Sequence, residues 1–244
     1  MVHGFTQTHR VFDRQVPVFR EPFNLLLVDL RGHGGSSHFP GPFGIEEYTD
    51  DLEGLVDCYG LKTFYYWGTH TGTAIGLVYT LRHPGRVLGL ILEGTVLPGF
   101  PMPRVPELID RAGRIAVNQG MLAAKDDWFD RADWFDYIRK HPRECRAAEH
   151  REMIMDFSGE PWLQRQNPRA VTNVDLRLNE LRLPILMYNG IEDMADFLNA
   201  AGHIRRVKGD AQYQTIPNAG GFPGWENPDV VNRIVTEFLK NLVR

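Results

Sequence analysis

A histidine stands at the centre of a glycine-flanked pentapeptide, Gly68-Thr69-His70-Thr71-Gly72. The residues before it are typical of a strand and those after it of a helix, so a strand-to-helix turn is predicted here. A turn with this glycine spacing holds its central side chain, in a strained conformation, at the mouth of a sheet. Because an unperturbed imidazole titrates at about 6.5, His70 would be a base near neutral pH.

The chain offers no serine nucleophile at this turn. Its serines are Ser36, Ser37 and Ser158, and none of them stands in such a turn. A serine hydrolase needs a hydroxyl, a base that takes its proton and an acid that holds the base. We therefore expect proton transfer at position 70, either from a carbon next to a carbonyl, as in lyases and isomerases, or from water.

Alternating strands and helices are predicted to position this turn. Apolar or β-rich runs at 23–29, 62–68, 86–94, 184–190 and 211–217 indicate strands of a parallel sheet. Apolar residues at helical spacing indicate helices at 45–59, 74–83 and about 228–242. The alternation predicts an α/β fold with a doubly wound, mostly parallel sheet.

Strand patterns are missing between residues 96 and 178, where we expect only helices, for example over 104–119 and 121–139. An all-helical insertion in an α/β sheet is most simply a cap over the carboxyl edge of the sheet. We therefore predict a core of residues 1–95 and 179–244 and a cap of residues 96–178. Cap aromatics are expected to form core or pocket wall and to favour an apolar or aromatic ligand: Trp128, Phe129, Trp134, Phe135 and Trp162.

Composition argues against several classes of protein. Of 244 residues, 43% are hydrophobic and 24% charged, as in ordinary globular chains. A net charge of −4 without a basic stripe gives nucleic-acid binding no support, and no apolar run reaches the roughly 18 residues that span a membrane. Met1 leads into no signal-peptide pattern, and Cys58 and Cys145 are too few for a disulfide scaffold. We expect a cytoplasmic protein.

Further motifs resemble those of the α/β-hydrolase fold family, in its branch of capped esterases, epoxide hydrolases and C–C hydrolases. The motifs are His3-Gly4-Phe5, residues 29–34 (DLRGHG), residues 83–87 (HPGRV), residues 190–193 (GIED) and residues 216–222 (IPNAGGF). The resemblance covers nearly the whole chain, except that the first strands of the family have no counterpart here.

The resemblance implies an altered catalytic triad. It places His70 at the position of the nucleophile, Asp193 at that of the acid and Gly221 at that of the base. Conventional hydrolysis through an acyl-enzyme is therefore not expected. We expect the imidazole to lean into the space beside the glycine, towards Asp193, which would orient it. The backbone amides of Phe5 and Thr71 would form an oxyanion hole.

Other residues of the predicted site would line the ligand pocket: His3, Gly4, Thr69, Trp128 and Phe222. A metal site made of His3, His33 and His70 is an alternative that we do not adopt, and the resemblance implies no metal and no cofactor.

Three functions remain open from the sequence. The first is a cofactor-independent enzyme that acts on a small apolar or aromatic carbonyl compound, with His70 as general base and Asp193 as its orienting acid. The second is a ligand-binding pseudoenzyme that keeps the cavity but has lost the triad. The third is an altered ordinary hydrolase, in which Ser at position 70 and His at position 221 would recover esterase activity. The partner is a small molecule in each case, and the sequence predicts no oligomeric state.

The first residues pose a separate question. The strand that ends at His3 is expected to lie between the strands at 23–29 and 62–67. Starting at Met1, it has two or three residues, so backbone groups in the middle of the sheet would stay unpaired, which is costly. We therefore expect further residues before Met1.

Overall fold

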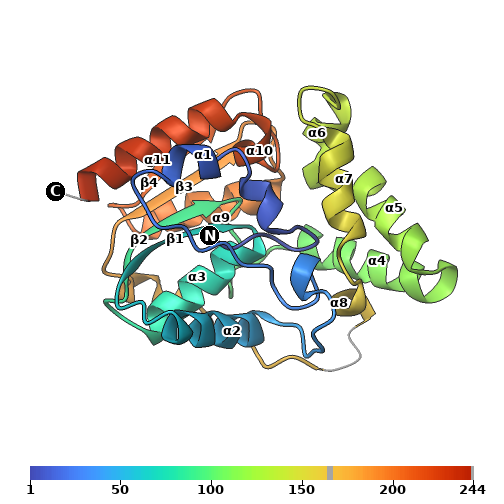
Figure 1. The fold of residues 1–244 in the computed structure, drawn as a ribbon, viewed down its shortest axis with the longest axis horizontal. Coiled ribbons are helices and arrows are strands. Elements are labelled where there is room, and N and C mark those ends of the chain that lie inside the picture. The colour runs from blue at the N-terminus through green and yellow to red at the C-terminus, as the bar shows by residue number, and fades with distance from the viewer. Residues whose placement is uncertain (164–166, 243–244) are drawn as a thin grey trace.

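A parallel sheet of four strands forms the centre of the molecule. The computed structural model describes residues 1–163 and 167–242. The strands are β1 (Phe64–Thr69), β2 (Val87–Glu93), β3 (Ile185–Gly190) and β4 (Gln212–Ile216), and they lie in the order β1-β2-β3-β4. Helices lie on both sides of the sheet (Figure 1). The α/β fold predicted from the sequence is confirmed.

Both faces of the sheet are buried along most of β1, β2 and β3, as the continuous apolar runs predict, whereas the edge strand β4 is largely exposed. Trp67, Ile91 and Leu186 are register partners in neighbouring strands, and they share one core cluster with α11 (Pro228–Leu242). The residues that precede each of them belong to a second cluster with α2 (Ile45–Cys58), α3 (Thr71–Arg82) and α9 (Ala195–Val207). The helices predicted at 45–59, 74–83 and 228–242 are confirmed.

Shorter helices complete the layers: α1 (Val16–Phe19), α10 (Pro223–Glu226), η1 (His9–Phe12), η2 (Gly34–Ser36) and η4 (Asp175–Glu180), where η denotes a 3-10 helix. Among the helices of the described residues, none is both long and apolar enough to cross a membrane.

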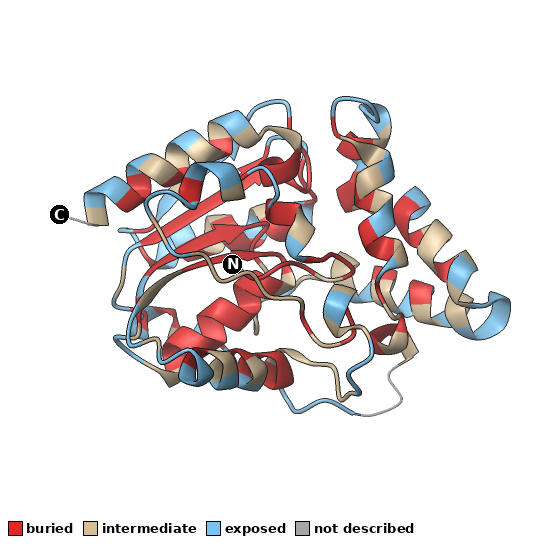
Figure 2. Cartoon of the chain, viewed as in Figure 1, coloured by how far each residue is buried: buried red, intermediate tan, exposed pale blue. Residues whose placement is uncertain are grey.

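The insertion between β2 and β3 is helical, and within residues 96–163 and 167–178 it contains no strand. It comprises α4 (Arg104–Gln119), α5 (Met121–Arg131), η3 (Asp133–Phe135), α6 (Asp136–Lys140), α7 (Ala147–Met155) and α8 (Glu160–Leu163). Figure 1 shows these helices beside one end of the sheet, and Figure 2 shows that buried residues continue from the strands into α5 and α7. The boundaries of a separate cap at 96 and 178 stay a prediction.

One helix prediction in the insertion is wrong. The continuous helix expected over 121–139 is interrupted at Ala132, whose ψ of 131° is extended. The break turns Trp134 and Phe135 into the interior, where both are buried. Aromatic burial therefore overrides the helical propensity of this stretch.

The strand predicted at 23–29 is also wrong. Within the described chain, this segment has only one bridge, between Val28 and Val2, and Val2 also bridges to Gly68 in β1. A strand needs a partner along its whole length, and among the described residues 24–28 hydrogen-bond only to the short stretch at Met1–His3. Unpaired backbone is expected at this place from the sequence, but the apolar run at 23–29 still predicts a strand because apolar character does not depend on a partner.

Candidate active site

His70 lies in the predicted turn between β1 and α3. Its φ of 45° and ψ of −112° are strained for a residue with a side chain, at a cost of about 1–3 kcal/mol. Its N–H donates to the carbonyl of Glu93 at 2.8 Å, and its own carbonyl accepts the N–H of Thr73 at 2.8 Å. The flanking glycines permit this close approach, because a Cβ at Gly72 would lie 2.2 Å from the carbonyl oxygen of Val2.

Substitution of Gly72 by Ala is expected to lower the free energy of unfolding by about 3 kcal/mol or more, because the added methyl group collides with backbone that cannot turn aside. Urea denaturation measures this loss. The matched control is Gly54→Ala in α2, where a Cβ meets no atom within 4 Å. That variant should gain up to about 1 kcal/mol, since alanine favours a helix. An equally stable Gly72→Ala protein would contradict the rigid turn.

The imidazole of His70 is enclosed by apolar groups and stands 7% exposed. The rings of Phe197 and Phe222 each lie 4.8 Å from it between centroids. Neither ring nitrogen has a hydrogen bond of good geometry among the described residues, although the backbone of Gly221 lies within reach of a weak one. Burial lowers the pKa of His70 to about 3, and the nearby backbone of Gly221 opposes this shift without reversing it. The ring is therefore neutral at pH 7, and the ordinary pKa of about 6.5 assumed from the sequence is wrong for this site.

Asp193 follows β3 and is buried, but other groups hold its carboxylate. Asn189 donates to one oxygen at 2.7 Å, and the backbone N–H of Met194 donates to the other at 2.7 Å. No hydrogen bond joins Asp193 to His70 in the part of the chain that the structure describes. Burial raises the pKa of Asp193 to about 7 despite these two donors. The role of Asp193 in orienting the imidazole stays a prediction.

The expected space beside Gly221 is filled. A Cβ at Gly221 would lie 2.4 Å from the carbonyl oxygen of Trp134 and 2.8 Å from its Cβ. The helical insertion therefore places backbone where the resemblance would put a histidine ring. Our expectation of an open space at this point is wrong, although the imidazole of His70 does lie near the backbone of Gly221.

The two predicted oxyanion donors are backbone amides. Thr71 is the first residue of α3, so its N–H has no acceptor within the helix. Phe5 follows the His3-Gly4 pair, and its N–H has no hydrogen-bond partner among the residues described. Its ring packs against Trp128, with 6.1 Å between centroids. That these two amides stabilise a negative oxygen beside position 70 stays a prediction.

The predicted binding residues His3, Gly4 and Thr69 take part in structural hydrogen bonds. His3 donates from Nδ1 to the carbonyl of Gly4 at 2.7 Å and accepts the N–H of Leu30 at Nε2 at 3.0 Å. Gln7, which the sequence analysis missed, accepts the N–H of Gly4 at 3.0 Å and the hydroxyl of Thr69 at 3.1 Å. These bonds hold the loop of Phe5 against the end of β1.

The two predicted aromatic binding residues come from opposite sides of the site. Phe222 contacts His70, and Trp128 of α5 donates its indole N–H to the hydroxyl of Thr6 at 2.9 Å. His150 of α7 packs against Phe222 with 4.6 Å between centroids, and the sequence analysis missed it because no spacing links it to position 70. No set of three side chains suited to a metal is found within the described residues.

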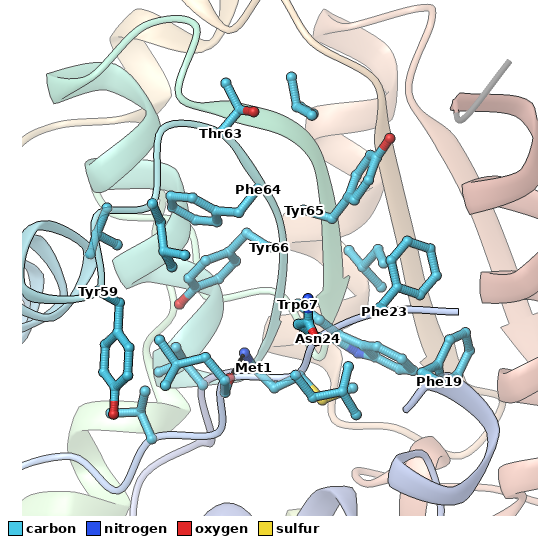
Figure 3. Close-up of a pocket in the computed structure, with 18 of the residues that line it drawn as sticks. Met1, Phe19, Phe23, Asn24, Tyr59, Thr63, Phe64, Tyr65, Tyr66 and Trp67 are labelled. Atoms are coloured by element: carbon cyan, nitrogen blue, oxygen red, sulfur yellow. Dashed lines mark hydrogen bonds between the residues drawn. The ribbon is translucent and has the colours of Figure 1, made fainter. Parts of the chain in front are cut away.

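A cavity of about 580 Å³ lies away from His70, between residues 24–28 and β1 (Figure 3). It adjoins Met1 and Val2, at the place where the neighbouring strand is short. Its wall is apolar, and aliphatic side chains alternate there with aromatic ones, which are Phe19, Phe23, Tyr59, Phe64, Tyr65, Tyr66 and Trp67. His70 does not line it, so this cavity is separate from the site at the turn.

The chain belongs to the α/β hydrolase fold family, whose model matches residues 1–131. A curated relative, the putative carbamate hydrolase RutD of Caulobacter segnis, is 25% identical over 93% of this chain and 85% of its own. A thermophilic esterase from Thermogutta terrifontis, 24% identical, superposes with a TM-score of 0.82 over 99% of this chain and 88% of its own. An enol-lactonase from Burkholderia xenovorans, also 24% identical, superposes with a TM-score of 0.81 over 98% of this chain and 90% of its own.

Proposed function

We propose that this chain is an enzyme that acts, without a cofactor, on a small apolar or aromatic carbonyl compound, with His70 as general base in place of a serine nucleophile. One observation carries the proposal: a buried imidazole, neither of whose ring nitrogens has a hydrogen bond of good geometry among the described residues, is held in a strained strand-to-helix turn. An unpartnered buried polar group costs about 1–3 kcal/mol. A ligand that hydrogen-bonds to His70 would offset this cost.

The proposed chemistry divides between the ring and the amides. The neutral imidazole accepts a proton from carbon next to the carbonyl, or from water that attacks it. The amides of Phe5 and Thr71 stabilise the negative oxygen that develops. That negative charge also favours the imidazolium of His70 during the reaction. The apolar rings around the site suit an apolar or aromatic substrate, and the RutD name suggests by analogy a carbamate-type carbonyl.

A second candidate is a ligand-binding protein without turnover. It is favoured by the two donors that hold Asp193 and by the backbone of Trp134 beside Gly221, because neither arrangement assists proton transfer. In that case His70 only accepts a hydrogen bond from the ligand.

Turnover of a short-chain p-nitrophenyl ester by the parent and by His70→Ala tests the proposal. Loss of a general base is expected to lower kcat by about 10²–10⁴-fold. Because the pKa of the ring is about 3, the parent should keep its activity from pH 8 down to about 5 and lose it only below about 4. His141→Ala, at an exposed histidine of the insertion, is the control and should leave kcat unchanged.

The result also separates the two candidates. Equal turnover in the parent and in His70→Ala would overturn the role of the histidine as base. No turnover in either protein, with p-nitrophenol quenching tryptophan fluorescence in the parent but not in His70→Ala, would support the ligand-binding protein.

A further inference from the structure

Gln7 has an unambiguous orientation because one of its partners is a backbone N–H. The amide of Gly4 can only donate, so the atom that accepts it at 3.0 Å is the carbonyl oxygen of the Gln7 side chain. The hydroxyl of Thr69 donates to the same oxygen at 3.1 Å. The other end of the side chain is therefore the NH₂ group, which can only donate.

This orientation determines the tautomer of His150. The NH₂ group of Gln7 lies 3.4 Å from Nε2 of His150, so this ring nitrogen must be the acceptor. Burial lowers the pKa of His150 to about 3, which makes the ring neutral at pH 7. A neutral imidazole carries one proton, so the proton resides on Nδ1.

The Nδ1–H of His150 donates no hydrogen bond to the described residues. His150 is completely buried, and Nδ1 has no hydrogen-bond partner among the described residues. The ring is surrounded by Phe135, Phe222 and Trp225, with centroid distances of 5.4, 4.6 and 5.3 Å. Buried donors are almost always paired in native proteins, so an unpaired one requires an explanation.

The position of the ring suggests that explanation. His150 and His70 pack against the same side chain, Phe222, and they are close enough to influence each other electrostatically. One histidine comes from the strand-to-helix turn and the other from α7 of the insertion. A ligand that took the place of the Phe222 ring would therefore lie next to both histidines.

We propose that the Nδ1–H of His150 donates a hydrogen bond to the ligand of the His70 site, so that the site selects compounds with a second acceptor oxygen besides the reacting carbonyl. This inference rests on the proposed function, since it assumes that a carbonyl compound binds at His70. The donor is neutral, so the second oxygen is that of a ketone, ester or hydroxyl group rather than of a carboxylate.

Nitrogen NMR of the ¹⁵N-histidine-labelled protein tests the tautomer without any ligand. The expected result is a protonated Nδ1 and a bare Nε2 for His150 at pH 7, assigned with His150→Gln. A protonated Nε2 would overturn the proposal directly, whatever the protein does with substrates.

Three matched probes then test the donor: 1-phenylbutane-1,3-dione, 1-phenylbutan-1-one and butylbenzene, with two, one and no carbonyl oxygens. The dione should bind about tenfold more tightly than the monoketone, as one added hydrogen bond allows, and it alone should shift the Nδ1 resonance. If both ketones bind and shift the ring nitrogen resonances of His70 but not those of His150, the proposed role of His150 fails while the proposed function stands. If none of the probes binds, both fail together.

Two variants separate binding of the ligand from contact with Gln7. His150→Asn places an amide near the Nδ1 position and keeps a donor there, so the preference for the dione should survive within about threefold. His150→Gln reaches towards Gln7 but has no donor at Nδ1, so the tenfold preference for the dione should disappear. A preference kept only in His150→Gln would mean that His150 acts structurally through Gln7, which contradicts the proposal. His141→Gln is the surface control.

Discussion

A double variant with His70→Ser and Gly221→His is expected to lose at least about 3 kcal/mol of unfolding free energy and to show no esterase activity. The reason is steric. A Cβ at position 221 would lie 2.4 Å from the carbonyl oxygen of Trp134 and 3.0 Å from its Cα, so a whole imidazole has no room. Adding methylene groups to a packed interior commonly costs about 1–3 kcal/mol of unfolding free energy. An imidazole adds more volume than a few methylene groups, so its cost is expected to be at least as large.

Urea denaturation and p-nitrophenyl ester hydrolysis measure the two effects. His70→Ser alone isolates the change at the turn, and it should lose far less stability than the double variant. Gly209→His is the matched control for a new imidazole, because a Cβ there meets no atom within 4 Å, and it should unfold like the parent.

The opposite outcome would be informative about the insertion. A stable double variant with esterase activity would mean that η3 moves away from position 221 and admits a histidine ring. The chain would then be an altered ordinary hydrolase whose triad can be rebuilt, and the packing of Trp134 would be a consequence of the glycine.

Between pH 5 and pH 8, the unfolding free energy of Glu93→Gln is expected to rise relative to that of the parent by up to about 3 kcal/mol. Glu93 ends β2 and is completely buried; burial, together with the smaller effect of the nearby Asp193, raises its pKa to about 7. One of its oxygens accepts the N–H of Gly224 at 2.8 Å, a bond that the carbonyl of a glutamine can also accept. The other oxygen has no hydrogen bond of good geometry among the described residues, and the hydroxyl of Tyr188 near the carboxyl group lowers its pKa only in part.

The direction follows from proton linkage. In the folded protein the pKa of Glu93 lies above its unfolded value of 4.5, so folding is favoured by the proton this group binds. That stabilisation is complete below pH 4.5 and is lost as the pH rises through 7, where the buried carboxylate must ionise. Each unit of pKa shift corresponds to about 1.4 kcal/mol, which sets the upper bound.

Denaturant unfolding of both proteins at pH 5, 6, 7 and 8 measures this difference. Glu21→Gln, at an exposed side chain, is the control, and its unfolding free energy should depend on pH in the same way as that of the parent over the whole range. Asp193 has a raised pKa of about 7 for the same reason, so Asp193→Asn should change the pH dependence in the same direction as Glu93→Gln. Parallel curves for Glu93→Gln and the parent would show that the carboxyl group is hydrated in solution.

The sequence by itself determined most local elements of this protein and the turn at His70, but not the irregular segment at 23–29 or the break at Ala132. Strands β1 to β4 follow from apolar or β-rich runs, and α2, α3 and α11 from helical spacing, because both patterns depend on residues close together in the chain. The glycines at 68 and 72 predicted the sharp turn because only they permit the backbone to approach so closely. The motifs that resemble the hydrolase family added the positions of Phe5, Thr71 and Asp193 around it.

Only the tertiary structure decided the state of the site. Burial makes His70 a neutral ring with a pKa of about 3, and burial depends on Phe197 and Phe222, which are more than a hundred residues away. Trp134 fills the space at Gly221 because the insertion folds back over the sheet. The contact of Gln7 with His150 likewise joins residues 143 positions apart. Such packing depends on which distant segments meet in the folded protein, and a pattern among neighbouring residues does not indicate which segments meet.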